Sequence, residues 1–122
     1  MKHMETSLGE VRVSALPELF AELTGLIRET SKTVRHVPGV ALTGGSSPKA
    51  YFRWLAERPG ELPEAKGGIV FTVSDERHVP LESNDSNFGN AMRLLFDPLG
   101  VQKENCFPWD THRPAAEAAE WY

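Results

Sequence analysis

The sequence has little cysteine: among its 122 residues, only Cys106 carries a thiol. One cysteine excludes an internal disulfide framework and a metal site built from several cysteines. It is also in keeping with a reducing compartment. We expect Cys106 to be a small, buried and unreactive side chain, because that is the commoner role of an isolated cysteine.

Long hydrophobic runs and an excess of basic residues are also missing. No stretch approaches the roughly 20 apolar residues of a membrane span, and residues 1–5 lack the apolar core of a signal peptide. Lysine and arginine total 13 against 17 aspartates and glutamates, a net charge of −4. The sequence therefore predicts a soluble cytoplasmic protein with no membrane partner, and one that lacks the overall basic excess that drives binding to nucleic acid.

What is present is an ordinary globular composition. Hydrophobic residues make up 40% of the chain and charged residues 25%, which is typical of folded domains and argues against disorder. We find neither internal repeats nor low-complexity tracts. A chain of this length suits a single α/β domain over residues 1–122, or half of a larger domain.

Hydrophobic periodicity indicates strands that alternate with helices. Apolar and polar side chains alternate over residues 11–15, which predicts a short strand with one solvated face. Apolar residues then recur at spacings of three and four over residues 17–35, as in an amphipathic helix that begins at Pro17. After a break at a Pro-Gly pair, residues 40–42 form a short apolar strand.

The second half of the chain continues this alternation. Ser47 and Pro48 predict the N-cap and the first residue of another helix. Residues 69–73 are nearly all apolar, as in a strand of a parallel sheet that is covered on both faces. Ser86 and Asn87 then begin a third helix, and residues 85–87 resemble its N-terminal cap. Two further elements are expected after it, a short strand over residues 105–109 and a helix over residues 115–122.

This order of elements predicts an α/β fold of the Rossmann-like layered type, with a mainly parallel sheet flanked by helices. In such sheets, ligands bind beyond the carboxyl ends of the strands. Two polar loops follow apolar strands in this way, at residues 43–47 and 74–85. We therefore expect the functional residues at these two loops.

The first loop joins a strand to a helix N-terminus, where glycines allow close approach and free N–H groups favour an anion such as phosphate. The residues expected to hold it are Gly44, Gly45, Ser46, Ser47 and Lys49. An ordinary glycine-rich turn with a serine cap explains the same residues equally well. The loop matches neither the Walker pattern nor G-x-G-x-x-G, so the sequence gives no support for dinucleotide binding.

The second loop concentrates charge directly after the most apolar strand. Arg77 is suited to pair with a phosphate or carboxylate, and Asp75 to orient a water or hydroxyl or to transfer a proton. The alternative is a surface turn whose charges neutralise one another. We expect the four histidines to have surface or packing roles, although His78 stands beside acidic residues.

Three segments resemble one family: LTGGSSP at 42–48, FTVSDERHVP at 71–80 and DSNFG at 85–89. In order and spacing they are similar to the 6-phosphogluconolactonase family, which is related to the glucosamine-6-phosphate deaminase/isomerases. The S-D-E-R form favours the lactonase over the deaminase. The resemblance implies hydrolysis of 6-phosphoglucono-δ-lactone to 6-phosphogluconate in the pentose phosphate pathway, with no metal and no organic cofactor.

The same resemblance implies roles for particular residues. Gly44, Gly45, Ser46 and Arg77 would help to hold the phosphorylated sugar lactone or sugar acid. Asp75 would lie at the reacting end of that ligand.

The sequence departs from the family in one respect. Family members carry a later loop of the form G-x-G-x-D-G-H-x-A-S, whose histidine is thought to activate water, and no such segment occurs here. The chain therefore resembles the N-terminal half of a lactonase and is expected to be inactive by itself. The alternatives are a non-catalytic domain that binds sugar phosphates or associates with itself, and a deaminase/isomerase relative.

The oligomeric state can also be predicted from the resemblance to only half of a lactonase. A strand that is apolar on both faces needs more covering helices than the chain supplies. Exposed sheet edges and apolar patches drive association. We therefore expect a homo-oligomer, most simply a two-fold dimer.

Overall fold

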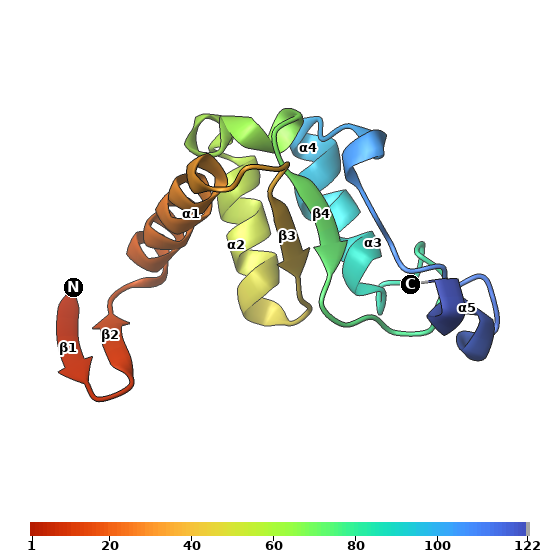
Figure 1. The fold of residues 1–122 in the computed structure, drawn as a ribbon, viewed down its shortest axis with the longest axis horizontal. Coiled ribbons are helices and arrows are strands. Elements are labelled where there is room, and N and C mark those ends of the chain that lie inside the picture. Colours follow the sequence, from red (N-terminus) through yellow and green to blue (C-terminus); the bar gives the residue numbers. More distant parts are fainter. Residues whose placement is uncertain (122) are drawn as a thin grey trace.

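The computed structural model describes residues 1–121 of the chain (Figure 1). Its strands and α-helices are β1 (Lys2–Thr6), β2 (Gly9–Val13), α1 (Leu16–Thr33), β3 (Gly39–Leu42), α2 (Ser46–Ala56), β4 (Val70–Val73), α3 (Asn87–Ala91), α4 (Asp97–Leu99) and α5 (Ala115–Trp121). A π-helical turn, Met92–Phe96, joins α3 to α4. The predicted α/β alternation is confirmed from α1 onward. The predicted last helix includes Tyr122, which lies outside the described residues.

The centre of the fold is a parallel strand pair. β3 and β4 align so that Val40 lies opposite Phe71 and Leu42 opposite Val73. A third segment runs beside the other edge of β4, where the Phe107 N–H donates to the Phe71 carbonyl (N···O 2.8 Å). Cys106 forms an isolated parallel bridge with Phe71 at the same place.

The strand expected over residues 105–109 is reduced to this contact. A 3₁₀ turn, Lys103–Asn105, occupies its beginning. Pro108 follows Phe107 and has no N–H to donate to a strand ladder. The prediction of a strand was therefore wrong in extent, although the segment does lie beside β4.

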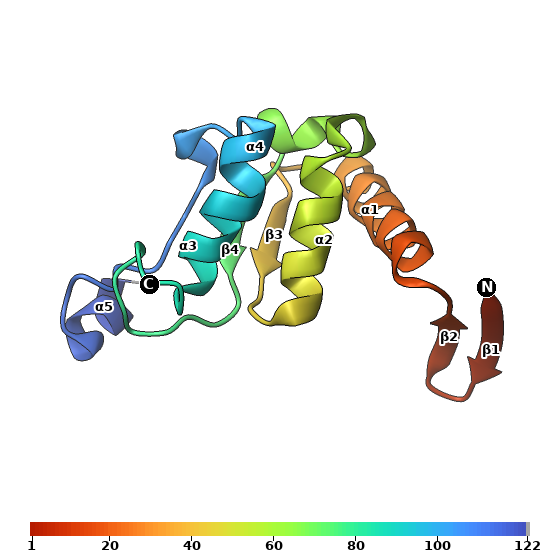
Figure 2. The same ribbon diagram turned by 180° about the vertical axis from the view of Figure 1, so that it is seen from behind.

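One face of the strand pair is covered by helices. Seen from behind, α2 and α3 lie over β3 and β4 (Figure 2). One buried cluster joins the helices to the strands. It contains Phe52 and Leu55 of α2, Phe71 and Val73 of β4, and Phe88 of α3. Burial of apolar side chains of this size stabilises the fold by about 1.5–3 kcal/mol each. This layer fixes the positions of the loops that leave the two strands.

Helix α1 packs on the outer side of α2 through aromatic and polar contacts. The ring of Phe20 lies 5.4 Å from that of Tyr51 and 5.9 Å from that of Trp54, between centroids. The hydroxyls of Thr24 and Tyr51 are hydrogen bonded at 2.9 Å, and both side chains are buried. The amphipathic helix predicted over residues 17–35 is thus confirmed, with its end at Thr33.

The other face of the strand pair is open among the described residues. Gly39 and Ala41 of β3 are exposed, and Val70 and Thr72 of β4 are only partly buried. Side chains alternate between the faces of a strand, so this exposure belongs to one face. The prediction that residues 69–73 are covered on both faces was wrong, because no described helix lies over this side.

The strand expected over residues 11–15 is displaced and belongs to a separate sheet. β2 pairs with β1 as an antiparallel hairpin at the end of α1, away from β3 and β4 (Figure 1). All ten residues of the hairpin strands are exposed, so the expected single solvated face was wrong. α1 begins at Leu16, which leaves too little chain for the strand to continue to residue 15.

The expected cap of α2 also differs from the structure. The helix begins at Ser46 and its N-cap is Gly45, with φ 110° and ψ 176° and no side-chain cap hydrogen bond. Ser47 therefore lies within the first turn and Pro48 is the third helical residue. The positive φ explains the change, because glycine adopts this conformation without the strain that serine would suffer.

Candidate functional site

The two loops predicted to carry function meet in the structure. They leave β3 and β4, and because those strands are parallel, both loops emerge at the same edge. The Thr43 hydroxyl from the first loop donates to Asp75 Oδ1 in the second, at 3.0 Å. Both loops were expected to be functional because each follows an apolar strand, and the structure brings them into contact at this edge.

Asp75 is exposed, and its carboxylate is held by hydrogen bonds on both oxygens. Thr43 bonds Oδ1, and the Ser74 hydroxyl lies 3.3 Å from the same oxygen. Asn87 Nδ2 lies 3.3 Å from Oδ2 and also donates to the Asp75 backbone carbonyl at 3.1 Å. A fixed carboxylate in contact with solvent is suited to orienting a water molecule or a hydroxyl group.

Glu76 has a structural role that the sequence did not reveal. Its carboxylate accepts hydrogen bonds from the backbone N–H groups of Asn87 (2.6 Å) and Phe88 (2.9 Å) and from the Ser86 hydroxyl (3.1 Å). These N–H groups are at the start of α3, where helices lack internal partners. Ser86 adds the predicted N-cap, accepting from the Gly89 N–H at 2.9 Å. Glu76 therefore fixes α3 to the loop.

The first loop places backbone rather than side chains at the site. A Cβ atom at Gly44 would lie 2.1 Å from Asn87 Oδ1, so a side chain there would displace the Asn87 amide. Ser46 and Ser47 are exposed in the first turn of α2, and Lys49 is half-buried and donates its backbone N–H to the Gly45 carbonyl. This uncapped turn offers N–H groups and the positive end of the helix dipole to an anion.

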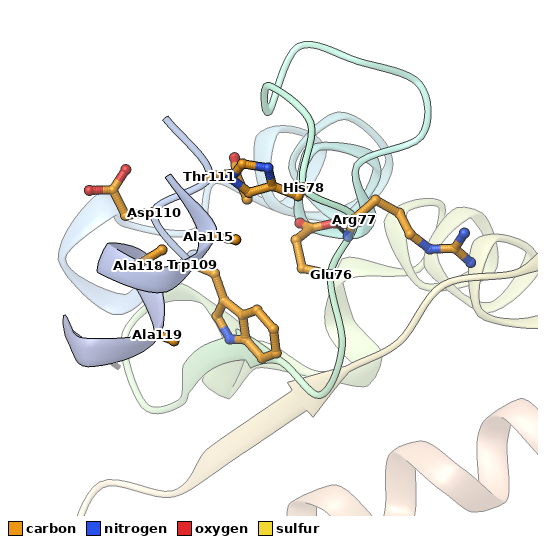
Figure 3. A pocket seen from close by; sticks show the side chains of 9 residues that line it. All are labelled: Glu76, Arg77, His78, Trp109, Asp110, Thr111, Ala115, Ala118 and Ala119. Atoms are coloured by element: carbon orange, nitrogen blue, oxygen red, sulfur yellow. Dashed lines mark hydrogen bonds between the residues drawn. The ribbon is translucent and has the colours of Figure 1, made fainter. Parts of the chain in front are cut away.

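The side chains of Arg77 and His78 point in different directions (Figure 3). Arg77 is exposed, points away from Trp109, and its guanidinium makes no hydrogen bond or ion pair within residues 1–121. His78 Nε2 lies 2.8 Å from the Arg113 carbonyl, which ties the second loop to the segment before α5. The packing role expected for His78 agrees with this contact, while Arg77 remains available to a ligand.

A cavity of about 350 Å³ lies between the second loop and α5 (Figure 3). Its walls are Glu76, Arg77 and His78 of the second loop, residues 109–111, and Ala115, Ala118 and Ala119 of α5. Neither Asp75 nor any residue of the first loop lines it. The cavity therefore shares Arg77 with the predicted anion site but contains neither Asp75 nor the glycine loop. Sequence patterns did not reveal it, because its other walls come from residues 109–111 and from α5, more than 30 positions farther along the chain.

Cys106 behaves as expected of an isolated, packed cysteine. It is half-buried against the core, and its thiol lies 3.5 Å from the Gln102 carbonyl. Burial raises the pKa of the Cys106 thiol, and the charges of Asp97 and Glu104 raise it further. A thiol that stays protonated is a poor nucleophile.

These features define a class of protein. Parallel strands joined through helices, with polar loops gathered at the carboxyl ends of the strands, are typical of α/β folds, in which ligands generally bind at that edge. No helix within residues 1–121 is long and apolar enough to cross a membrane. The chain belongs to the family of glucosamine-6-phosphate isomerases and 6-phosphogluconolactonases, whose model matches residues 14–122.

Similar sequences carry the lactonase name. The chain is 39% identical over 83 residues to the 6-phosphogluconolactonase of Thermotoga maritima, covering 68% of this chain and 36% of that protein. It is 37% identical over 109 residues to the 6-phosphogluconolactonase of Rhizobium meliloti, covering 87% and 44% of the respective chains. The chain thus spans less than half the length of these relatives.

Solved structures agree with this assignment. The 6-phosphogluconolactonase of Thermotoga maritima matches with a TM-score of 0.75 at 31% identity, over 91% of this chain and 49% of that one. The enzyme of Trypanosoma brucei matches with a TM-score of 0.75 at 28% identity, over 92% and 47%. A monomeric glucosamine-6-phosphate deaminase shares the fold, with a TM-score of 0.67, at 16% identity.

Proposed function

We propose that this chain is 6-phosphogluconolactonase-like and contributes the ligand-binding edge of that fold. The observation that carries the proposal is the hydrogen bond between Thr43 and Asp75, which joins the glycine loop to the acidic loop. The lactonase relatives support it. The ligand is then a phosphorylated sugar lactone or sugar acid, and we place the protein in the cytoplasm as one domain over residues 1–122.

The proposed roles follow from charge and exposure. The phosphate sits at the first turn of α2, against the backbone of Gly44 and Gly45 and the hydroxyls of Ser46 and Ser47, with Lys49 nearby. Arg77 supplies an exposed guanidinium for the same anion. Asp75 orients the water that attacks the lactone carbonyl, after which the ring C–O bond breaks and the proton lost by the water ends on the leaving oxygen.

Binding is the direct test of this proposal. Titration calorimetry with 6-phosphogluconate should show binding at or below millimolar concentration, weakened roughly tenfold or more in Arg77→Ala, because a charge-assisted contact is lost. Arg53→Ala is the matched control, since Arg53 is an exposed arginine near the other end of α2. No binding at millimolar ligand, or equal loss in both variants, contradicts the proposal.

We propose that the isolated chain has little or no lactonase turnover. Asp75 is not hydrogen bonded to any histidine within residues 1–121, and general acid–base help is worth about 10²–10⁴-fold. A spectrophotometric lactonase assay measures this. Turnover within about tenfold of a full-length lactonase would show that another group, such as His78, supplies the missing help.

A second candidate is a non-catalytic domain that binds sugar phosphates or associates with itself. The observation that favours it is the open face of β3 and β4 in a chain spanning less than half of its relatives. Binding of 6-phosphogluconate without turnover supports this reading for the chain as given. Conversion of glucosamine-6-phosphate would instead support the deaminase/isomerase alternative.

A further inference from the structure

We infer that Asn87 is a positioning residue, which holds the Asp75 carboxylate in place beside the glycine loop. The inference rests on the proposed function, because it assigns Asn87 a part in the same ligand site. It is carried by the contacts of one buried side chain with two loops, neither of which belongs to its own helix.

The first contact is with Asp75. Asn87 is 8% exposed and is the first residue of α3. Its Nδ2 group donates to the Asp75 backbone carbonyl (3.1 Å) and lies 3.3 Å from carboxylate Oδ2. Thr43 bonds the other carboxylate oxygen. With a donor at each of the two oxygens, the plane of the carboxylate is fixed rather than free to rotate.

The second contact is with the glycine loop. A Cβ atom built on Gly44 would lie 2.1 Å from Asn87 Oδ1, 2.7 Å from Cγ and 3.0 Å from Nδ2. All three atoms lie beyond the Cβ of Asn87, so its amide group fills the space that a side chain at position 44 would need. The amide is therefore packed directly against the backbone proposed to cradle the phosphate.

The backbone of Asn87 is held independently of its side chain. Its N–H donates to Glu76 Oε1 at 2.6 Å, and the Phe88 N–H donates to Oε2. Substitution of the Asn87 side chain leaves this anchor intact. Variants at position 87 are thus expected to fold, and their effects report on the amide group.

A double-mutant cycle tests the packing between the loops. Gly44→Ala should lower the Tm by several degrees, because its Cβ collides with the Asn87 amide. In the Asn87→Ala background, where the three colliding atoms are absent, the same change should lower the Tm by less than half as much. Additive Tm losses would overturn the inference.

Ligand affinity tests the positioning of Asp75. Asn87→Asp preserves shape but removes the donor and sets a second carboxylate beside Asp75. It should weaken binding of 6-phosphogluconate by about tenfold or more. Asn90→Asp is the matched control, because Asn90 is on the same helix and its Nδ2 donates to the Asn84 carbonyl. Equal affinities in the two variants would overturn the inference.

An exchange of the pair separates positioning from stability. Asp75→Asn combined with Asn87→Asp restores an amide beside a carboxylate, so it should regain the Tm lost in Asn87→Asp without regaining affinity. Recovery of both would show a purely structural role and would overturn the inference.

Failure of the proposed function gives a different result. If the unmodified chain binds no 6-phosphogluconate, the lactonase-like function is wrong. The crystal structure of Asn87→Ala then decides the inference. A rotated Asp75 carboxylate supports it, and an unchanged rotamer overturns it.

Discussion

At the scale of single residues, the buried hydrogen bond between Thr24 and Tyr51 connects α1 to α2. The Thr24 hydroxyl donates to the Phe20 carbonyl, so Tyr51 is the donor between the two hydroxyls. Burial raises the pKa of Tyr51, although the bond to Thr24 acts in the opposite direction. The phenol therefore remains protonated and able to donate across the neutral pH range.

We predict that Thr24→Val destabilises the chain by about 1–3 kcal/mol, because it leaves the buried Tyr51 hydroxyl without its acceptor. Chemical denaturation measures the loss. Adding Tyr51→Phe removes the stranded hydroxyl, so the double variant should be no less stable than Thr24→Val alone. A further loss in the double variant would contradict this explanation.

Sequence reasoning found the acidic and glycine-rich residues of the site but not what holds them. Asp75 and Gly44 were recognisable because charge and glycine stand out directly after apolar strands. Glu76 looked like one more charge of the same loop, and Asn87 like a capping residue. Their roles depend on contacts with residues 10 to 12 positions away along the chain, which no local pattern encodes.

At the scale of elements, the beginning of α3 depends on Glu76. We predict that Glu76→Ala destabilises the chain by about 2–4 kcal/mol, because several donors lose a charged acceptor at once. Denaturant unfolding measures the change. Glu82→Ala is the control, since Glu82 is exposed in the same loop and its loss should stay within about 0.5 kcal/mol. Similar losses in both variants would refute a specific capping role.

The hairpin β1–β2 should become less stable in acid. Hydrogen bonds from Arg12 and His3 lower the pKa of Glu10 from 4.5 to about 2. A lowered carboxyl pKa means that the Arg12–Glu10 ion pair supports the hairpin fully above about pH 4.5 and loses its effect as the pH falls through about 2.

An NMR titration of the Glu10 carboxyl group measures this pKa directly. Arg12→Gln should return it toward 4.5, and added salt should do the same in part, because the group is at the surface. A midpoint near 4.5 in the unmodified chain at low salt would show that these ion pairs do not persist in solution.

The helices and strands were predictable where the pattern was strong and local. The long periodic stripe of α1 and the apolar run of β4 were both found. The hairpin was misjudged because its strands have no covering layer, so alternation carried no information about burial. The start of α2 was misplaced because a left-handed glycine, not a serine hydroxyl, precedes it.

At the scale of the whole molecule, large apolar side chains are exposed at one end. On one face of the hairpin, Met4, Val11 and Val13 are 52%, 39% and 50% exposed. On the neighbouring helix α1, Leu23 and Leu26 are 43% and 59% exposed. A two-stranded hairpin is marginally stable without a covering layer, so we expect this end of the molecule to pack against a second surface.

We predict that the 122-residue chain self-associates, most simply as a two-fold dimer. Light scattering on protein of confirmed mass measures this. Leu23→Glu with Leu26→Glu should shift the chain to monomer. Trp121→Ala is the control, because Trp121 is an exposed aromatic residue on α5 at the opposite end of the molecule (Figure 1). A well-folded monomer at tens of micromolar would contradict the prediction.

The arrangement of the strands also predicts that backbone hydrogen bonds last longer in β4 than in β3. β4 has neighbours on both edges, β3 on one side and the Phe71–Phe107 contact on the other, whereas β3 pairs only with β4 among the described strands. We therefore expect the β4 amides that donate to β3 to exchange with solvent only when the central layer opens, while amides on the free edge of β3 exchange by local fluctuation. The glycine loop, which begins at Thr43, follows β3, the strand with the less protected backbone. We therefore expect the glycine loop to deform more easily than the loop that carries Asp75, which follows β4.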